Sequence, residues 1–251
     1  MQLLDNQLTR MTECKLCRQQ KKLIKAHIIP EAFYELKKHG NLPLVILGEA
    51  PKGKVKKSRL GYYDENILCE MCDCELGKLD QHAAEKLLQS CNRQLIQNND
   101  LVIYQYNGAE AKSIIRFVAS VIWRASISTL PFFQRVKTSN YEEQLREFIC
   151  GKGTLDLDKS ILITEFDYPD APILAPFNSR SEGVNIIVLQ ASRFQFFLKL
   201  DKRPMPKDIV EVCLQSEKPV YAIVSEWKKS HNFFESNSLI SKSDRPKLPI
   251  K

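Results

Sequence analysis

The sequence has 251 residues but no run of 18 or more apolar ones, which excludes a membrane-spanning helix of ordinary length. Its first residues lack the basic-then-apolar pattern of a signal peptide, so we expect a protein that is not exported and stays in the cytoplasm, away from membranes. The C-terminal part has no glycine-rich phosphate loop and no nucleophile elbow, so it reveals no chemistry by its sequence.

Negative charge is scarce in the first quarter of the chain. Residues 1–60 hold 13 Lys/Arg against 5 Asp/Glu, whereas residues 61–251 hold 24 against 25. A local basic excess is typical of binding to a phosphate backbone, although a solvated basic loop that keeps the protein soluble has the same composition. We therefore predict contacts with nucleic acid in the densest basic segment, which consists of Lys52, Lys54, Lys56, Lys57 and Arg59.

Eight cysteines stand in a chain that we expect not to be exported, so they indicate metal ligands and buried thiols rather than disulfides. Cys14 and Cys17 form one C-x-x-C pair, and Cys69 and Cys72 form another. Each spacing lets two thiolates reach one ion from a tight turn, and two such turns complete a tetrahedral site. We predict a structural Zn²⁺ bound by these four residues. A redox pair or two unrelated buried pairs are the alternatives, and the redox one lacks a βαβ context.

The remaining cysteines fit other roles. Cys74 offers a further sulfur beside the second pair, but on a helix that begins near residue 73 it would point away from the ion, so we expect it not to be a ligand. Cys91, Cys150 and Cys213 lie in apolar segments, where cysteine usually acts as a small core residue.

Hydrophobic periodicity predicts an α+β protein. The polar residues near 98–100 mark a predicted boundary between an N-terminal domain, 1–98, and a C-terminal α+β domain, 99–251, whose role is unknown. That second domain is a candidate surface for a protein partner or a second copy of the chain. We expect helices over residues 30–38, 75–98, 110–128 and 139–150, and strands over 23–29, 44–47, 161–166, 184–189, 194–200, 209–213 and 220–224.

His27 lies in the segment KAHIIP, between the two cysteine pairs. A lone histidine in an apolar strand is by default a hydrogen-bonded core residue. However, the order CKLC, AHIIP and DENILCEMCDCELGKLD resembles the HNH endonuclease family. The later WRAS, residues 123–126, is similar to a bacterial subgroup of that family. The resemblance covers residues 14–90 and reaches the rest of the chain only through the helix that contains WRAS.

The resemblance implies an N-terminal zinc-bound treble-clef, or ββα-metal, module. By this resemblance His27 takes a proton from the attacking water, Asn66 orients His27, and Asp73 holds a catalytic Mg²⁺ or Mn²⁺. Asp80, two helical turns further on, would assist through a water. The implied activity is metal-dependent hydrolysis of phosphodiester bonds in nucleic acid, foremost DNA, as in a restriction or defence effector.

Three positions keep other functions open. The residue before the first histidine often helps to hold the cation in the family, but here it is Ala26, which cannot be a ligand. Asp73 also fits a helix N-cap, and Asn66 also fits a turn. A non-catalytic zinc-stabilised module that binds nucleic acid or a protein is therefore the second hypothesis. A redox-sensing or zinc-sensing regulator is the third.

Overall fold

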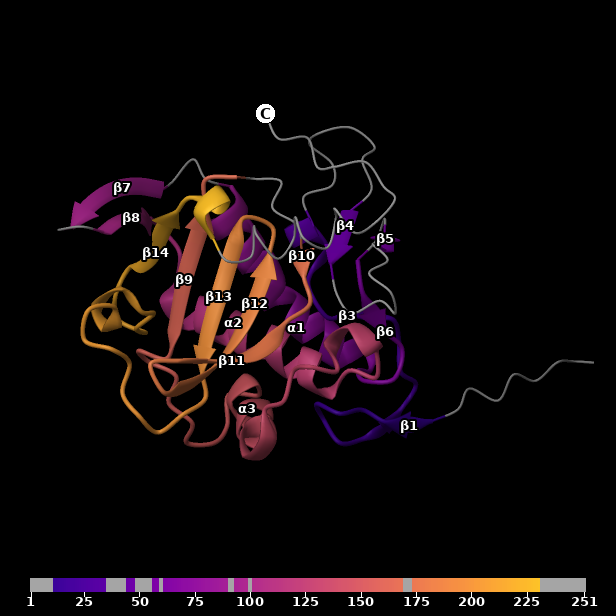
Figure 1. Cartoon of the computed structure of the whole chain (residues 1–251). Helices are drawn as coiled ribbons and strands as arrows, with labels where there is room; N and C mark the ends of the chain where they lie inside the picture. The colour runs from indigo at the N-terminus through magenta and orange to yellow at the C-terminus, as the bar shows by residue number, and fades with distance from the viewer. Residues whose placement is uncertain are drawn as a thin grey trace, which may run out of the picture.

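The computed structural model describes residues 11–34, 44–47, 56–58, 61–89, 93–98, 101–168 and 173–230. It is a mixed α/β structure with one large sheet and few helices (Figure 1). No helix among the described residues has the length and apolar character needed to cross a membrane. Four residues singled out above lie outside the described part: Lys52, Lys54, Arg59 and Cys91. For Lys56 and Lys57 the structure describes the backbone but not the side chains.

The large sheet has seven strands, rich in β-branched and aromatic residues. Neighbouring strands run antiparallel, except that β9 and β14 run parallel to each other. Across the sheet the order is β11 (Phe177–Ser181), β12 (Val184–Ala191), β13 (Phe194–Lys199), β9 (Ile161–Phe166), β14 (Val220–Ser225), β8 (Leu101–Tyr106) and β7 (Arg93–Asn98).

The described residues form three α-helices, of which the middle one packs on the sheet and contacts the other two. They are α1 (Glu70–Ala83), which continues into the π-helical turn η2 (Ala84–Leu88), α2 (Ala111–Ile127) and α3 (Glu142–Ile149). Figure 1 shows α1 and α2 behind the sheet. The middle helix, α2, is buried almost all round because it contacts α1, α3 and β13.

The N-terminal part consists of very short elements. Strands β1 (Thr12–Glu13) and β2 (Gln20–Lys21) form a hairpin, and β3 (Ala26–His27) pairs with β6 (Tyr63–Asp64). A 3₁₀ turn, η1 (Glu31–Tyr34), follows β3. The backbones of β10 (Ile173–Leu174), β4 (Leu44–Leu47) and β5 (Lys56–Ser58) form a three-stranded sheet. Further 3₁₀ turns are η4 (Pro131–Phe133), η5 (Ser139–Tyr141), η6 (Val210–Val212) and η7 (Trp227–Lys229).

One hydrophobic core joins the N-terminal part to the sheet. Phe33 of η1 is completely buried and stacks on Phe117 of α2, with ring centroids 5.1 Å apart. It also meets Phe194 and Phe196 of β13 edge to face. The predicted domain boundary at 98/99 lies between β7 and β8, which pair with each other. The two predicted domains therefore share a core.

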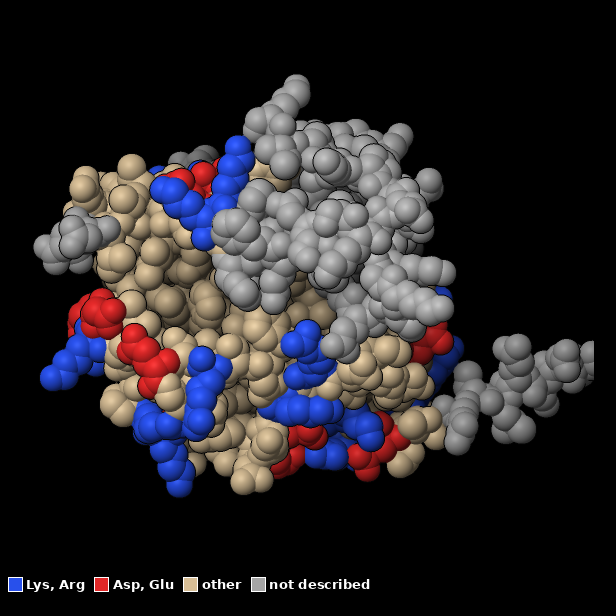
Figure 2. Space-filling model, in the orientation of Figure 1, with Lys and Arg blue, Asp and Glu red and all other residues tan. Residues whose placement is uncertain are grey.

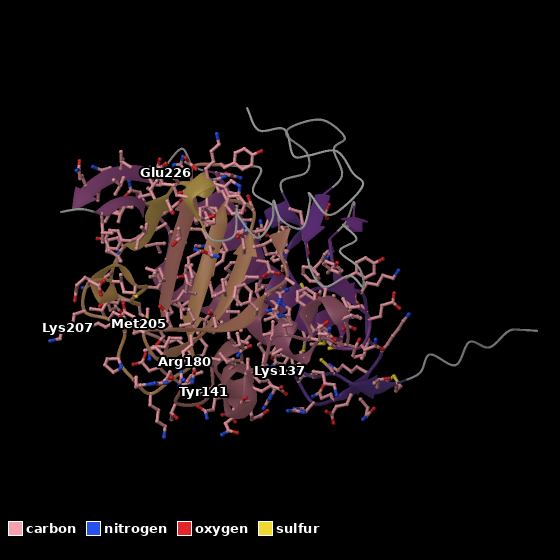
Figure 3. All side chains as sticks on the ribbon, viewed as in Figure 1. Lys137, Tyr141, Arg180, Met205, Lys207 and Glu226 are labelled. Carbon is pink, nitrogen blue, oxygen red and sulfur yellow. The ribbon has the colours of Figure 1, made fainter. Side chains whose placement is uncertain are left out.

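Loops attach α3 to the far edge of the sheet. The side chain of Asn178, in β11, accepts a hydrogen bond from the backbone N–H of Lys137 and donates one to its carbonyl, each 2.8 Å long. Figure 3 shows Lys137, Tyr141 and Arg180 near this edge. The edge strand β11 is thus paired with β12 and also bound by the loop that leads toward α3.

Most predicted elements are confirmed, including the helix at 110–128 and the strands at 161–166, 184–189, 194–200 and 220–224. The strand predicted at 209–213 is wrong, because the N–H groups of Ile209 and Val210 turn back to the carbonyl of Pro206 and start a 3₁₀ turn. The helix predicted over 75–98 is wrong beyond Leu88, because residues 93–98 pair with β8 instead.

Candidate metal centre and the histidine beside it

The four cysteines of the two C-x-x-C pairs lie together. The sulfur atoms of Cys14, Cys17, Cys69 and Cys72 are all within 4.8 Å of one another, and those of Cys17 and Cys69 are 4.0 Å apart. A tetrahedral Zn²⁺ with bonds of about 2.3 Å would place its sulfurs about 3.8 Å apart. The donor set therefore fits a metal ion such as zinc.

Local backbone geometry builds each half of this group. The turn between β1 and β2 closes through Arg18 N–H to Cys14 O (2.8 Å), with Arg18 in the left-handed region at φ 61°. Cys69 is the N-cap residue of α1, and Cys72 lies in the first turn of the helix. Two bonds join the halves: Lys15 N–H donates to Ile67 O (2.9 Å), and Cys69 N–H donates to the Cys14 sulfur (3.3 Å).

The sulfurs perturb one another. Burial raises the pKa of Cys14, but N–H groups of Cys17, Cys69 and Leu16 outweigh burial and lower that pKa to about 7. Burial and the neighbouring cysteine sulfurs raise the pKa of Cys72 well above its ordinary value. Several thiolates cannot crowd together without a compensating cation, and a bound dication deprotonates a coordinating thiol outright.

The other cysteines divide between surface and core. Cys74 is exposed and is not a member of the group, in line with its predicted lack of a ligand role. Cys213 is buried, as predicted. The core placement predicted for Cys150 is wrong: this residue is exposed, because α3 ends at Ile149 and Cys150 follows as its C-cap.

His27 stands on the ribbon formed by β3 and β6. The side chain is partly exposed and faces Tyr63 across the ribbon, with ring centroids 6.2 Å apart and the rings nearly perpendicular. The ammonium group of Lys25, two residues before His27, lies 5.1 Å from the centre of the Tyr63 ring. Since residues two apart share one face of a strand, Lys25, His27 and Tyr63 form one partly exposed group.

Asp73 lies in the first turn of α1, immediately after the last cysteine of the group. Burial raises the pKa of its carboxyl group; the neighbouring Arg124 and His27 side chains act in the lowering direction, and Asp80 acts in the raising one. Asp73 and His27 are thus electrostatic neighbours. Within the described part of the chain, however, the four cysteines are the only cluster of three or more His, Cys, Asp or Glu residues that could hold a metal ion. A cation at Asp73 would need waters or substrate oxygens to complete its shell.

Asn66 is exposed and has partners other than the predicted one. Its backbone N–H and side-chain amide donate to one oxygen of Asp64, at 2.9 and 3.2 Å. The amide also reaches the Thr129 hydroxyl at 3.4 Å. Its role in orienting His27 stays a prediction, and the geometry found is that of a turn residue. Ala26 is completely buried and pairs with Asp64 in the ribbon.

Asp64 was not singled out in the sequence. Its side chain is buried, and it accepts hydrogen bonds from the Ser128 hydroxyl (2.9 Å) and from the N–H (2.7 Å) and hydroxyl (3.0 Å) of Thr129. Burial acts to raise the pKa of Asp64, but these donors and the Asn66 N–H outweigh burial and lower it. The carboxylate therefore ties β6 to the residues just after α2.

Arg124, within the WRAS segment, was noted in the sequence only as part of the resemblance. Its guanidinium is buried, forms a two-pronged ion pair with Asp80 (2.9 and 2.7 Å), and donates to the carbonyl of His27 (2.9 Å). Asp80, predicted to assist a cation through water, is thus the partner of Arg124. One signal was available: a charged residue inside an apolar helix must find a partner, although the sequence does not show which.

Surface charge on the described part is mixed. Arg18 and Arg146 both pair with Glu143, at 2.8 and 2.6 Å, and so link the β1–β2 turn to α3. Figure 2 shows basic and acidic side chains together along the lower edge of the molecule, while the middle of the described face in view carries few charges. Binding of nucleic acid by residues 52–59 stays a prediction, since those side chains lie outside the described part.

Comparison of the chain with protein-family models, curated proteins and solved structures found no match. Function must therefore be inferred from the site itself. That site combines a group of sulfurs fit for a metal ion, a partly exposed imidazole on a short ribbon, and a carboxylate at the start of the helix that follows.

Proposed function

We propose that this chain is a zinc-stabilised nuclease of the HNH type, in which a treble-clef, or ββα-metal, module hydrolyses phosphodiester bonds, foremost in DNA. The observation that carries the proposal is the position of His27. Its imidazole is partly exposed on a two-stranded ribbon, and Asp73 lies in the first turn of the next α-helix. A ribbon that bears a histidine and is followed by a helix that bears a cation ligand is the arrangement that the sequence resemblance implies.

The zinc ion has a structural role in this proposal. Four sulfurs fill a tetrahedral shell, and no position is left open for a reacting water. Two of them come from the β1–β2 turn and two from the start of α1. An ion held by all four fixes the first turn of α1, and with it Asp73, against the N-terminal hairpin.

The chemistry is assigned to His27 on β3 and to Asp73 in that turn. The His27 imidazole accepts a proton from the attacking water, a contribution worth about 10²–10⁴ in rate for a well-placed base. Asp73 is the residue that would hold Mg²⁺ or Mn²⁺, with the rest of the shell supplied by waters and substrate oxygens. When bound, this cation stabilises the charge that develops on the phosphate and on the leaving oxygen. Lys25, which is exposed beside His27, offers a contact for the flanking phosphates.

A plasmid assay tests the proposal. Supercoiled DNA is incubated with Mg²⁺ or Mn²⁺ and with the wild-type chain, His27→Ala or His82→Ala. His82, on α1, is a matched control because it is also a partly exposed histidine. Wild type and His82→Ala should nick the plasmid at rates within about twofold, and His27→Ala should be slower by about 100-fold or more. Equal rates for wild type and His27→Ala, or binding without cutting by both, would reject the nuclease.

A second candidate is a non-catalytic zinc-stabilised module that binds nucleic acid or a protein partner. Two observations favour it: the Asn66 amide bonds to Asp64, and the described residues contain no second cluster of metal ligands. In this case the chain binds DNA in the plasmid assay and leaves it intact. Replacing Lys54, Lys56 and Lys57 by Gln should then reduce the slope of log K against log salt by about 0.9 for each lost phosphate contact. An unchanged slope would reject the basic segment as the contact.

A further inference from the structure

All five N–H groups of the Arg124 guanidinium have acceptors. One terminal nitrogen donates to Asp80 and to the His27 carbonyl, both at 2.9 Å. The other donates to Asp80 at 2.7 Å and to the Ser120 hydroxyl at 3.4 Å. The Nε donates to the Ser120 carbonyl, also at 3.4 Å. Five donors are the full capacity of an arginine, and the residue is only 1% exposed.

Stability alone does not account for this arrangement. Burying an ion pair costs so much desolvation that an apolar pair of similar volume is often as stable. The planar fork of an arginine adds direction, because two parallel bonds to a carboxylate fix the orientation of the whole group. Here the fork belongs to α2 and the carboxylate to α1, and one of the other three donors reaches β3.

The bond from Arg124 gives the His27 carbonyl, on the ribbon, a hydrogen-bond donor. Among the described residues, β3 and β6 form a sheet of two strands, and no described strand pairs with the backbone groups on the outer edge of β3. The other strand, β6, is held from the same helix, because Ser128 and Thr129 follow α2 and donate to Asp64. Helix α2 therefore holds both strands of the ribbon that carries the histidine.

We propose that Arg124 is a positioning residue for His27. By holding the His27 carbonyl and Asp80 at once, it sets the place of β3 relative to α1, and so the place of the imidazole relative to Asp73. The catalytic consequence rests on the nuclease function proposed above; the positioning itself does not. The proposal gives residues 99–251 a role in the site, because their first helix supplies the arginine.

The test uses the full-length chain with Arg124→Lys, which keeps the charge and loses the fork. Arg193→Lys is the matched control: this second buried arginine pairs with Glu165 (2.7 Å) in the large sheet and donates to the carbonyl of Leu87 (3.1 Å). For each variant we would measure zinc content, kcat and KM for DNA cleavage, amide exchange in β3, and the NMR signals of the His27 ring.

Arg124→Lys should retain zinc, lower kcat by about tenfold or more with KM within about twofold, shift the His27 ring signals and speed exchange in β3. A misplacement of about 1 Å at a catalytic group can cost 10²-fold in rate. Arg193→Lys should leave kcat and the ring signals close to wild type. Equal losses of kcat in the two variants, or unchanged ring signals in Arg124→Lys, would overturn the proposal.

Failure of the nuclease function and failure of the positioning role give different results. If the wild-type chain cuts no nucleic acid, the nuclease function fails, and the ring signals and β3 exchange still decide whether Arg124 positions His27. If Arg124→Lys does not fold, Asp80→Asn takes its place, since it weakens the same fork and preserves the shape of the side chain. A shift of the His27 ring signals in Asp80→Asn with zinc retained supports the proposal, and unchanged signals contradict it.

Discussion

The two parts of the molecule are ordered in different ways. In the cysteine region, residues 11–34 and 61–83, each strand is two residues long. In the sheet region, the seven-stranded sheet with α2 and α3, strands of five to eight residues enclose an apolar core. Strands of two residues contribute few backbone bonds and little burial. The cysteine region must therefore take its order from the sulfur group and from its contacts with the sheet region.

Those contacts combine a shared apolar core, which includes the packing of α1 on α2, with several specific links. Phe33 inserts among the aromatic rings of α2 and β13. Arg124 reaches the His27 carbonyl, and Arg146 of α3 donates to the Leu16 carbonyl at 2.7 Å. The comparison teaches that the sheet region serves as the scaffold, and that the metal centre and the ribbon are attached to it at defined points.

Removing the metal should produce the largest difference in amide protection between the two regions. Structural zinc contributes about 10–16 kcal/mol of apparent folding energy in small modules. Cys72→Ser should therefore lose the ion and its amide protection in β1, β2, β3 and α1, while β9, β12 and β13 stay protected; metal analysis and hydrogen exchange measure this. Cys74→Ser, which removes an exposed thiol outside the group, is the control and should behave as wild type. Equal metal content in the two variants would contradict the claim that the cysteine region is ordered by its metal site.

Truncating Phe33, which packs against rings of α2 and β13, should lower the stability of both regions together. Phe33 is completely buried, and Phe→Ala changes of this kind cost about 3–5 kcal/mol. We expect Phe33→Ala to shift one cooperative urea transition by this amount, whether the transition is followed in the cysteine region or in the sheet. Leu95→Ala, at a residue that is 59% exposed, should change the free energy of unfolding by less than about 0.5 kcal/mol. Two separate transitions would show that the regions fold independently.

Asp64→Asn should change how the free energy of unfolding depends on pH, because Asp64 ties β6 to the residues after α2. The folded pKa of Asp64 lies below its unfolded value of about 3.9, so its stabilisation is full above that value and is lost as pH falls through the folded pKa. We expect the variant to lose about 2 kcal/mol at pH 7, because buried donors lose a charged acceptor. Between about pH 5 and 3 its free energy of unfolding should fall less steeply than that of wild type. Parallel pH curves from urea titrations would contradict this role.

The smallest effect is expected at the exposed link between the regions. Glu143 pairs with Arg18 and Arg146, but its side chain is half exposed. Such pairs contribute about 0–1 kcal/mol, so Glu143→Gln should lower the free energy of unfolding by at most that amount, and by less in 1 M salt. Glu142→Gln, at the preceding residue of the same helix, is the control. A loss well above 1 kcal/mol would show that this link does more than a surface ion pair.

Features set by local spacing were the ones that the sequence could predict. Two residues between cysteines are enough for a turn around an ion, and the structure brings all four sulfurs together. The face of α2 that carries Ile114, Val118 and Ile122 repeats with the helical period and is buried as expected. Strands β9 and β14 are apolar enough to be found without knowledge of their partners.

Features set by distant partners could not be predicted. Arg124 acquires its role from residues 44 and 97 positions away along the chain. Residues 93–98 can follow a helical pattern or form a strand, and pairing with β8 decides between them. The short apolar run at 209–213 is equally ambiguous, and the turn after Pro206 decides its structure. In each case a tertiary contact overrides a weak local preference.

X-ray absorption at the zinc edge of the purified full-length chain, together with the zinc-to-protein ratio, tests the central claim most directly: that two distant cysteine pairs form one metal site. The account predicts about one zinc per chain, surrounded by four sulfur ligands at about 2.3 Å. A folded chain without zinc, or a zinc shell that contains nitrogen or oxygen ligands in place of sulfur, would contradict it.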